Sequence, residues 1–484
     1  MVQHTHKKYL VLGLGQSGAA AARWCAHQGW AMRLADTRSS PPEIESLQAD
    51  LAQADVQWVL GPDALAPSVL ENIDVLVLSP GLSPQDDEVA ALLSAAQARG
   101  IACLNDLGLF AQALAEAATT RDYRPQLLAI TGTNGKTTVA RMLTHMLQAH
   151  GVAAQAAGNI SPSFLGAWLT ATKTGQWPEV WVLECSSFQL QTMSDLQPTV
   201  GALLNISQDH LDWHGSATDY AAAKQRLLAV SERVVSNADD PAVQALQAQL
   251  PQSADSRWYF SQGQPEQDRS LGLCTDAAQT VWFCVHATTL KHLLPVAALQ
   301  VLGAHNQSNA LAALAVLAAA DWPIAQMASA LADFVGEAHR CEWVRTVRAV
   351  RFINDSKGTN VGATVAAIQG LPQNKILIAG GLGKGQDFAP LAQAVADHQV
   401  RHSFLYGADA SLIAQALDAA KQPYTVVDAL AQAVPQAFAQ AQANEVVLFS
   451  PACASMDQFA NYMQRGQAFV QAVEELALDL GEVL

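Results

Sequence analysis

Short apolar runs alternate with alanine-rich amphipathic segments along almost the whole chain. The first such runs are YLVLGLG, AMRLAD and VLVLSPG, and helix-like segments separate them. Apolar runs of this length between helical segments are typical of buried parallel strands in β-α-β units. The alternation returns in QLLAITG, WVLECSS, VGALLNIS and RVVSNAD, and again in VRFINDS, KILIAGG, HSFLYG, YTVVDA and EVVLFSP. The pattern predicts three consecutive α/β domains.

Two breaks in this pattern suggest where the domains meet. The polar segment TTRDYRP, residues 119–125, ends in proline, and a second break falls near Glu337. We therefore predict domains at residues 1–118, 119–337 and 338–484, the outer two Rossmann-like and the central one built on a mostly parallel sheet. Residues 251–300 are more polar, and RWYF and TVWFCVHA there predict antiparallel strands. An alanine- and leucine-rich helix is predicted from Asn306 to about Ala320.

Composition narrows the class of protein. The chain has 484 residues, is 50% hydrophobic and carries a net charge of −16, which argues against a nucleic-acid-binding protein. A local pocket can still bind an anionic substrate. The seven cysteines are scattered and form no C-x-x-C, so reduced thiols in a cytoplasmic protein are expected. No apolar run is long enough for a membrane span, and we expect a monomer.

A glycine-rich loop stands between a strand and a helix in the central region. TGTNGKTT, residues 131–138, follows QLLAI and precedes VARMLTHMLQAHG. It is shorter than the common phosphate loop, which would need a glycine where Ile130 stands. Backbone N–H groups at such a helix start can hold phosphate oxygens, Lys136 can neutralise phosphate charge, and the Thr137 hydroxyl can hold Mg²⁺. The alternative is a glycine-rich turn with an incidental lysine. The context favours a P-loop-type ATPase domain.

Two further segments offer metal ligands. Glu184 ends the strand in VWVLECSSFQL, where a carboxylate suits Mg²⁺, although it could also cap a helix. NISQDHLDWHG then packs Asp209, His210, Asp212 and His214 into a short loop. Such spacing could mark a zinc site, but no thiolate or distant third ligand is evident. We favour a polar loop beside the nucleotide, with His210 near a metal ion or a phosphate.

The first region carries a second glycine pattern. Gly13, Gly15 and Gly18 form G-x-G-x-x-G between a strand and a helix, and Asp36 ends the next strand. This is a dinucleotide fingerprint, but the same turn can hold any pyrophosphate. It predicts a nucleotide that bears a diphosphate.

The last region has three polar segments that each follow a strand. They are NDSKGTN, AGGLGKGQDF and SPACASMDQF. Ligands bind at the C-terminal ends of parallel strands, so three such segments together favour a ligand site. By contrast, Lys224 in DYAAAKQRLL reads by pattern as a solvated helix lysine.

Together these motifs resemble the Mur ligase family. The matching blocks are TGTNGKTT, LECSSFQL, NISQDHLDWH, DYAAAKQR, GAHNQSNALAAL, HRCEWV, NDSKGTN and SPACASMDQF, in order along essentially the whole chain. The short phosphate loop is the family's form. The resemblance implies an ATP-dependent ligase of peptidoglycan precursor synthesis. Its substrates would be UDP-N-acetylmuramoyl-L-alanine and D-glutamate, joined through an acyl phosphate.

The resemblance also implies roles for particular residues. ATP would be bound by Gly132, Thr133, Asn134, Gly135, Lys136, Thr137, Thr138, Asn306, Asn309, Arg340 and Asp355. Thr137, Glu184, His210 and Lys224 would serve two Mg²⁺ ions, Lys224 as a carbamate derived from CO₂, and Lys136, His210 and Lys224 would be catalytic. The UDP substrate would contact Gly15, Gln16, Ser17, Thr37, Arg38, Gly81 and Asn159, and D-glutamate would contact Thr359, Lys384, Ser455 and Tyr462.

The chain departs from the family pattern at two places. The segment often written GDIELF is NDLGLF here, so Gly108 replaces an acidic residue, and Tyr462 stands where phenylalanine is expected. Three alternatives remain at this stage: a sister ligase, either another Mur ligase or one like folylpolyglutamate synthetase; an NAD-dependent oxidoreductase; and a nucleotide-switched binding protein. The two linkers predict that the last domain swings in to close the site against water.

Overall fold

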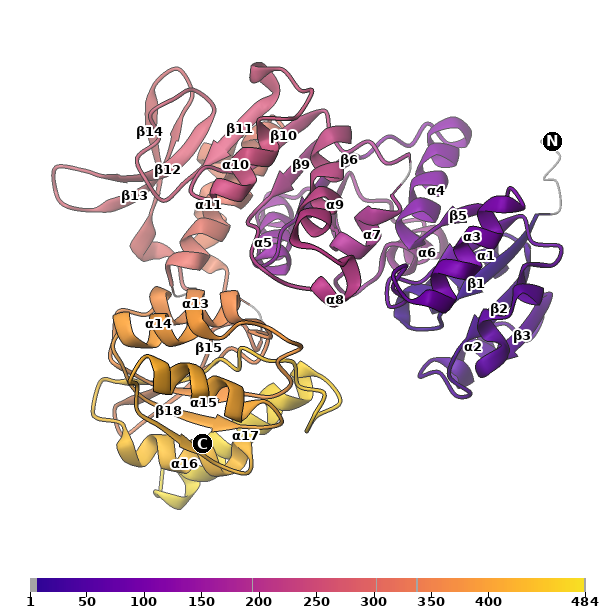
Figure 1. Cartoon of the computed structure of the whole chain (residues 1–484). Coiled ribbons are helices and arrows are strands. Elements are labelled where there is room, and N and C mark those ends of the chain that lie inside the picture. The colour runs from indigo at the N-terminus through magenta and orange to yellow at the C-terminus, as the bar shows by residue number, and fades with distance from the viewer. Residues whose placement is uncertain (1–6, 194, 302, 337, 483–484) are drawn as a thin grey trace.

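Three α/β domains follow one another along the chain, each built on its own β-sheet (Figure 1). This computed structural model describes residues 7–193, 195–301, 303–336 and 338–482. The predicted boundary at Glu337 lies outside the described residues. Helix α4 (Asp106–Thr120) runs slightly past the predicted end of the first domain at residue 118.

The first sheet is fully parallel and has five strands in the order β3-β2-β1-β4-β5. These are β1 (Lys8–Leu12), β2 (Ala31–Asp36), β3 (Val56–Leu60), β4 (Val75–Leu78) and β5 (Ala102–Leu104). The helices are α1 (Gln16–His27), α2 (Ile44–Asp50), α3 (Asp87–Ala98) and α4, with 3₁₀ turns at Pro62–Leu65 and Pro67–Leu70. The order reverses beside β1, where ligands bind in such sheets. The Rossmann-like prediction is confirmed.

The central sheet has nine strands in the order β14-β13-β12-β11-β10-β9-β6-β8-β7. They are β6 (Gln126–Thr131), β7 (Ala154–Gly158), β8 (Val180–Glu184), β9 (Val200–Leu203), β10 (Arg233–Asn237), β11 (Arg257–Phe260), β12 (Ser270–Thr275), β13 (Val281–His286) and β14 (Leu290–Pro295). The helices are α5 (Lys136–Ala149), α6 (Phe164–Thr174), α7 (Ser187–Gln191), α8 (Leu211–His214), α9 (Ala217–Val230), α10 (Pro241–Gln247), α11 (Ala304–Ala319) and α12 (Ile324–Met327). The helix predicted from Asn306 is α11.

One strand prediction is wrong. β11, the RWYF segment, pairs in parallel with both β10 and β12. It follows β10 through helix α10, and such a crossover returns the chain parallel to its start. The TVWFCVHA prediction is confirmed, because β13 is antiparallel to β12 and β14.

The cysteines also differ from the expectation of seven reduced thiols. Cys274 on β12 and Cys284 on β13 form a disulfide, while Cys25, Cys103, Cys185, Cys341 and Cys453 are free. The hairpin between β12 and β13 brings the two cysteines together. The sequence contains no cysteine motif that would predict this disulfide.

The third sheet has six strands in the order β15-β16-β20-β17-β18-β19. They are β15 (Glu342–Val347), β16 (Val350–Asn354), β17 (Lys375–Gly380), β18 (Val400–Tyr406), β19 (Tyr424–Val426) and β20 (Val446–Phe449). Among these, β15 and β16 pair antiparallel and the other pairs are parallel. The helices are α13 (Val361–Gly370), α14 (Ala389–Asp397), α15 (Ala410–Ala419), α16 (Leu430–Gln440) and α17 (Tyr462–Asp479).

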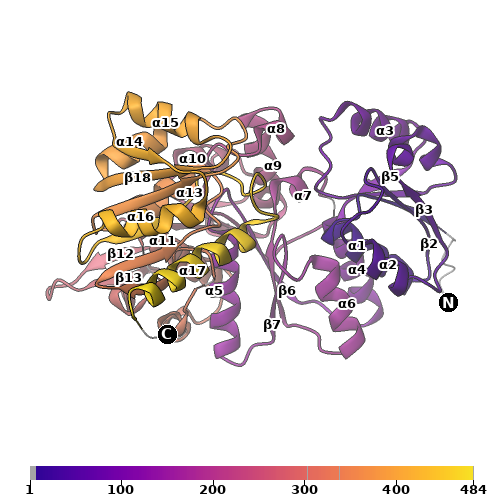
Figure 2. The same ribbon diagram turned by 90° about the horizontal axis from the view of Figure 1, so that it is seen from below.

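The first and central domains share one apolar core. Helices α1 and α4 pack against α6 of the central domain, as Figure 2 shows from below. Phe110 of α4 meets the rings of Trp168 and Trp181 edge-on, at centroid distances of 5.5 and 5.4 Å. Aromatic pairs of this kind add to the stabilisation from buried area. None of the described helices has the length and apolar character needed to cross a membrane.

Candidate active site

The central phosphate loop joins the end of β6 to the start of α5, as its sequence predicts. The segment after β9 holds it, because the N–H groups of Thr133 and Asn134 donate to Asn205 at 3.0 and 2.8 Å. Asn205 Nδ2 donates back to the Asn134 carbonyl at 3.1 Å. The loop therefore leaves the N-terminus of a 14-residue helix open to an anion. Sequence reasoning did not single out Asn205.

Gly135 has to be glycine for two reasons. Its φ is +85°, a left-handed conformation that side-chain-bearing residues rarely adopt. A Cβ atom there would also collide with the side-chain oxygen of Asn309 on α11. The loop thus packs directly against a predicted ATP-binding residue.

Two lysines meet at one carbonyl oxygen inside the loop. Lys136 Nζ donates to Gly132 O at 2.9 Å and to Thr133 O at 2.8 Å. Lys224 Nζ, from α9, donates to the same Gly132 O at 2.9 Å. Lys224 is 1% exposed, so its reading as a solvated lysine is wrong. Burial lowers the pKa of both ammonium groups, and Lys136 lowers the pKa of Lys224 further.

Glu184 has the features of a magnesium ligand. It ends β8, which pairs with β6, and its side chain is 2% exposed. Oε1 accepts a hydrogen bond from Asn159 Nδ2 at 3.0 Å, but the buried Oε2 has no partner among the described residues. A buried carboxylate oxygen left without a donor is costly unless a cation meets it. A carboxylate oxygen is the kind of hard ligand that Mg²⁺ prefers.

The loop after β9 carries Asp209 and His210. His210 Nε2 lies 3.6 Å from Asp209 Oδ2, and the ring of Phe188 contacts the imidazole edge-on at 4.7 Å. His214 is buried and shares a hydrogen bond with Ser187 Oγ at 2.9 Å. The Asp212 side chain lies outside the described residues. Among those described, this loop does not gather three metal-ligand atoms, which leaves the zinc alternative without support.

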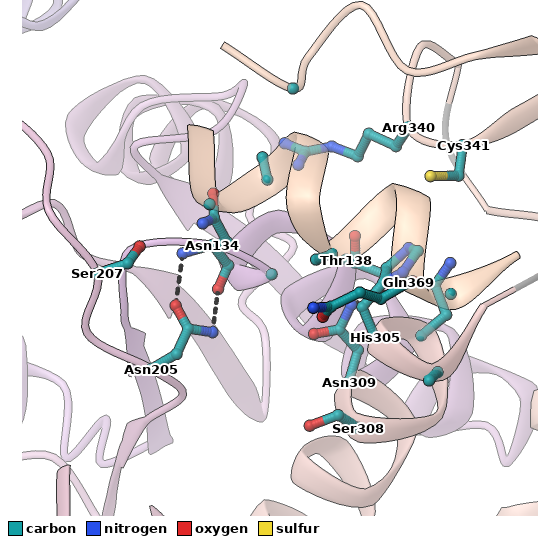
Figure 3. A pocket seen from close by; sticks show the side chains of 18 of the residues that line it. Asn134, Thr138, Asn205, Ser207, His305, Ser308, Asn309, Arg340, Cys341 and Gln369 are labelled. Carbon is teal, nitrogen blue, oxygen red and sulfur yellow. Dashed lines mark hydrogen bonds between the residues drawn. The ribbon is translucent and has the colours of Figure 1, made fainter. Parts of the chain in front are cut away.

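A cavity of about 440 Å³ lies between the central and third domains. Figure 3 shows Asn134, Asn205 and Ser207 at one side, Asn309 and Ser308 at another, and Arg340 reaching in from the third domain. Of the residues predicted to bind ATP, the cavity is lined by Asn134, Gly135, Thr138, Asn306, Asn309, Arg340 and Asp355. The structure therefore brings residues from distant parts of the sequence to one cavity beside the phosphate loop.

Two titratable groups in this cavity are strongly perturbed. Burial lowers the pKa of His305 from 6.5 to about 4, and its buried Nδ1 has no partner among the described residues. Burial raises the pKa of Asp355 to about 6, although Ser450 Oγ donates to it at 2.7 Å. Such perturbed groups gather at functional sites. Sequence reasoning missed His305, which directly precedes Asn306 in GAHNQSN.

A second, smaller cavity of about 90 Å³ adjoins the loop that carries His210. Thr359 and Lys384, both predicted to bind D-glutamate, line it together with Asp209 and His210. Asn360, next to Thr359, contacts the central domain, because its Nδ2 donates to Asp209 Oδ2 at 3.1 Å and to Asn134 Oδ1 at 3.3 Å. Third-domain residues thus reach the phosphate loop directly. Sequence reasoning did not single out Asn360.

Ser455 and Tyr462, the other two residues predicted to bind D-glutamate, are not among the residues that line this cavity. Ser455 is buried beside Ala454, which lines it, and Lys357 Nζ lies 4.1 Å from the centre of the Tyr462 ring. The fully buried Arg465 joins the two segments, since it donates to Ser356 O at 2.7 Å and to Cys453 O at 2.9 Å. Sequence reasoning missed this buried cation.

The glycine turn of the first domain is open above the start of α1. A Cβ at Gly15 or Gly81 would meet nothing within 4 Å, whereas one at Gly18 would strike the Gly13 carbonyl. Glycine at 18 therefore lets the turn and helix pack closely, and Gly15 leaves room for a ligand. Gln16 begins α1 beside it.

Asp36 and Arg38 form an ion pair at the rim of this turn. Arg38 donates to Asp36 at 2.9 and 2.8 Å, and Leu14 N donates at 2.7 Å. Burial by itself would raise the pKa of Asp36, but these hydrogen bonds outweigh it and the pKa is lowered. Thr37 and Arg38 are exposed. Asn159, by contrast, belongs to the central domain, where it follows β7 and donates a hydrogen bond to Glu184.

A buried polar cluster connects the turn to the central domain. Asp106, which is 2% exposed, accepts hydrogen bonds from Ser17 and from Gln189 Nε2, the latter at 3.3 and 3.1 Å. Burial raises the pKa of this carboxyl group. Ser17 is thereby fixed by a residue of the altered NDLGLF segment.

Three family models match the chain in order. They are the Mur ligase MurD-like N-terminal domain at residues 7–104, the Mur ligase middle domain at 130–317, and the Mur ligase glutamate ligase domain at 339–453. Curated relatives called UDP-N-acetylmuramoylalanine–D-glutamate ligase are similar over almost their full length. The protein from Bordetella avium is 46% identical and that from Burkholderia multivorans 44%, each over 98% of this chain and 97% of the relative.

Solved structures show the same fold at low sequence identity. UDP-N-acetylmuramate–alanine ligase MurC from Thermotoga maritima has a TM-score of 0.57 at 17% identity and covers 97% of this chain and 99% of its own. MurF from Acinetobacter baumannii has a TM-score of 0.59 at 17% identity, over 97% of this chain and 92% of its own.

Proposed function

The chain belongs to the Mur ligase family, and we propose that it joins D-glutamate to UDP-N-acetylmuramoyl-L-alanine at the expense of ATP, in peptidoglycan precursor synthesis. The relatives that carry this activity in their name are 44–46% identical over nearly the whole chain. The observation that carries the proposal is local. Thr359 and Lys384 of the third domain share a cavity with His210, beside the phosphate loop. A nucleotide site and an acceptor site therefore adjoin.

The reaction we propose has two steps. The L-alanine carboxylate attacks the γ-phosphorus of ATP, giving ADP and an acyl phosphate. The amine of D-glutamate then attacks the acyl carbon, and phosphate leaves as the amide forms. A free carboxylate is a poor electrophile, and phosphorylation supplies the leaving group. Catalysis of this kind depends mainly on positioning and on stabilising charge.

The residues of this chain would divide that work. Lys136 and the N–H groups at the start of α5 would hold the β- and γ-phosphates, and their positive charge would offset repulsion of the incoming carboxylate. Asn306, Asn309 and Arg340 would hold the nucleoside side in the larger cavity. The first-domain turn at Gly15 and Ser17 would hold the UDP diphosphate.

Magnesium fits the oxygen and nitrogen donors of this site. Thr137 and the unpartnered Oε2 of Glu184 would hold one ion, and His210 would serve a second. When bound, the ions supply charge neutralisation and template the phosphoryl oxygens.

Lys224 would act as a carbamate. CO₂ reacts with a neutral amine, and burial together with Lys136 lowers the pKa of Lys224, which favours that neutral form. The amine nitrogen bonds to the carbon of CO₂ and releases one proton. The product is an anion next to Lys136, which removes the repulsion between two buried cations.

As the alternative to serving the second ion, His210 would accept a proton from the amine of D-glutamate, because one imidazole lone pair cannot do both at once. It lines the cavity of Thr359 and Lys384, within the same small volume. Asp209 Oδ2, at 3.6 Å from its Nε2, would stabilise the imidazolium that forms. We further propose that the protein acts as a monomer in the cytoplasm, where both of its small-molecule substrates and ATP would be found.

The test is phosphate release from ATP and Mg²⁺ with UDP-N-acetylmuramoyl-L-alanine, with and without D-glutamate. The proposal expects release that needs both substrates, and a product heavier by one glutamate residue in mass spectrometry. Release with L-glutamate or another amino acid instead would favour a sister ligase. ATP binding without phosphate release that the substrates stimulate would favour a nucleotide-switched binding protein. Binding of NADH would favour an NAD-dependent oxidoreductase.

A further inference from the structure

Three metal-ligand side chains come together on the outer strands of the central sheet. Cys274 on β12, Cys284 on β13 and His292 on β14 each offer a ligand atom, and these atoms all lie within 4.8 Å of one another. Among the described residues, no other group of three histidine, cysteine or acidic side chains meets this condition. The motifs of the active site do not include any of the three.

The strand register places these side chains on one face. Cys274 lies opposite Trp282, and Cys284 lies opposite His292. Residues directly opposite each other share a face, as do residues two apart on one strand. The neighbouring Phe283 is fully buried on the other face, in the central apolar core.

A β-bulge creates the pairing with histidine. Phe283 lies opposite Leu294, so a regular ladder would set Cys284 opposite Leu293. The register shifts between Phe283 and Cys284, and His292 becomes the partner instead. Bulges commonly re-aim a side chain in this way. The bulge therefore places the imidazole of His292 close to the two sulfur atoms.

The surroundings suit a bound cation. The ring of Trp282 stacks on His292 at 5.2 Å between centroids and 16° between planes, which fixes the imidazole. Asp276 accepts a hydrogen bond from Trp282 Nε1 at 2.8 Å, which holds the indole ring in place. The stacked Trp282 ring thus limits the orientations that the His292 imidazole can adopt.

The cysteines are shielded and the histidine is not. Cys274 and Cys284 are buried. The loop with Gly263 and Pro265 lies against Gly272, which pairs with Cys284 and stands two residues before Cys274. His292 is exposed on β14, the edge strand. A small ion could therefore enter from the solvent side, where a water molecule could complete the coordination.

The cluster is remote from the active site. β12 is four strands away from β6, which leads into the phosphate loop, and strands lie about 4.8 Å apart, so the separation is about 20 Å. Figure 1 shows β12, β13 and β14 at the outer end of the central domain, on the far side from the first domain. The inference does not rest on the proposed ligase activity.

We propose that Cys274, Cys284 and His292, with both thiols reduced, form a binding site for a thiophilic d¹⁰ cation such as Zn²⁺. Two thiolates and one imidazole are a donor set that selects such ions over Mg²⁺. Two thiolates also balance the charge of a divalent ion, so the buried complex is neutral overall. The ion would join the edge strand β14 to β12 and β13.

The metal state and the disulfide state exclude each other. A dithiol reductant delivers two electrons and two protons to the Cys274–Cys284 bond, which breaks to two thiols while the reductant becomes its own disulfide. Binding of the divalent cation then forms two sulfur–metal bonds and releases the two thiol protons. In a reducing compartment the thiol state prevails.

The test is Co²⁺ titration of the full-length protein after reduction with dithiothreitol and anaerobic removal of the reductant. The proposal expects thiolate-to-cobalt charge-transfer absorption with tetrahedral visible bands, saturating at one Co²⁺ per chain and abolished by Zn²⁺. Protein left oxidised should give no such bands. Co²⁺ at an oxygen-ligand magnesium site lacks the charge-transfer band, so the active site does not interfere. A reduced protein without the band would overturn the proposal.

Matched variants identify the ligands. His292→Gln should weaken Co²⁺ binding by more than about tenfold, since even outer-shell partners change metal affinity by ten- to a hundredfold. His27→Gln is its control, because His27 is also exposed and also stacks on a tryptophan, Trp24. Cys284→Ser should remove the band and Cys103→Ser, at an exposed free thiol, should keep it. Because His292 is exposed, its variant reports on binding even if a buried cysteine variant unfolds. Unchanged affinity in His292→Gln would overturn the site.

Discussion

The active site is organised around the Gly132 carbonyl oxygen, which accepts hydrogen bonds from both Lys136 and Lys224. Two ammonium groups held this close repel each other in a medium of low dielectric constant. Glu184 and Asp209 favour the charged form of both lysines, but burial keeps the pKa of each lysine lowered, and Lys136 lowers that of Lys224 further. Bound phosphates would supply negative charge beside Lys136, and the proposed carbamate would replace the second positive charge at Lys224.

Glu184→Gln should abolish most of the ligase activity. The substitution keeps the shape of the side chain and its contact with Asn159, but it removes the charge that would hold Mg²⁺ at Oε2. Metal stabilisation of a transition state is worth several kcal/mol, so turnover should fall at least about a hundredfold. The Mg²⁺ concentration needed for half-maximal phosphate release should also rise.

Glu179→Gln is the matched control, because Glu179 is exposed just before the other end of β8. It should retain turnover and Mg²⁺ dependence. If Glu184→Gln kept both as well, with an unchanged melting temperature, Glu184 would not be a metal ligand.

His305 should make stability depend on pH below neutrality. In the unfolded chain it binds a proton below a pKa of about 6.5, and in the folded protein only below a pKa of about 4. Protonation therefore favours the unfolded state, and the stability present above pH 6.5 is lost as pH falls toward 4. At about pH 5 the loss is about 2 kcal/mol from this residue.

Thermal melting of wild type and His305→Gln at about pH 7.5 and about pH 5 measures this effect. The variant should lose less stability between the two conditions than the wild type. The comparison cancels the other titrating groups common to both proteins. Equal losses would mean that His305 titrates alike in both states.

Sequence patterns found the residues that stand in local motifs, such as Lys136 and Glu184, but not those placed by packing. Asn360 contacts Asn134 and Asp209, and His305 lies against Gly370, only where the third domain meets the central one. Lys224 did leave a signal: with Tyr220, Ala223, Leu227 and Leu228 it forms the buried face of α9. A lysine inside an i, i+3, i+4, i+7, i+8 stripe points inward. A lysine is usually exposed to solvent, so its identity alone predicts an exposed Lys224. Its position in the apolar periodicity of the helix predicts a buried one.

At the scale of elements, strands rich in branched residues were predicted and others were missed. β7 is AQAAG, which has no β-branched residue, yet it forms the edge of the central sheet beside β8. Pairing with a neighbour overrides its weak propensity. β11 was assigned the wrong direction for a related reason, since strand direction depends on the connection and not on the strand's own residues.

A side chain at Gly135, in the turn into α5, should be tolerated less well than one at Gly175, although the two glycines have similar backbone conformations. Gly135 and Gly175 both have left-handed φ values, +85° and +72°, but only at Gly135 does a Cβ meet other atoms within 4 Å. Gly175→Ala should cost roughly 1–2 kcal/mol in stability and keep turnover. Gly135→Ala adds the collision with Asn309, so it should destabilise more and weaken ATP binding.

Melting temperatures and ATP titrations of the two variants test this difference. Equal losses of melting temperature and of ATP affinity in the two variants would show that backbone strain alone matters at Gly135. Loss of ATP binding in Gly175→Ala would show that the effect is not local.

At the scale of the whole molecule, the two domain interfaces differ in kind. The first and central domains are joined by apolar packing of α1, α4 and α6, which makes a fixed unit. The central and third domains meet across a cavity and through polar contacts of Asn360 with Asn134 and Asp209. Polar contacts exchange readily with water, so this is the interface that can open.

A disulfide across that interface should stop turnover. A Cβ built on Gly362 of α13 would lie 3.4 Å from the Cβ of Ser207 in the central domain, close to the separation of a disulfide. In the double variant Ser207→Cys/Gly362→Cys, oxidation should lock the third domain closed. Phosphate release should then fall more than about tenfold and return on reduction, because nucleotide exchange needs opening.

The reduced double variant and Ser207→Cys alone serve as controls, since they share the substitutions without the cross-link. Native Cys103 is an exposed thiol, and the single variant accounts for its oxidation as well. If the locked protein turned over as fast as the reduced one, opening between these domains would have no part in the cycle. ATP would then enter the 440 Å³ cavity from its solvent side while Asn360 stays in contact with the phosphate loop.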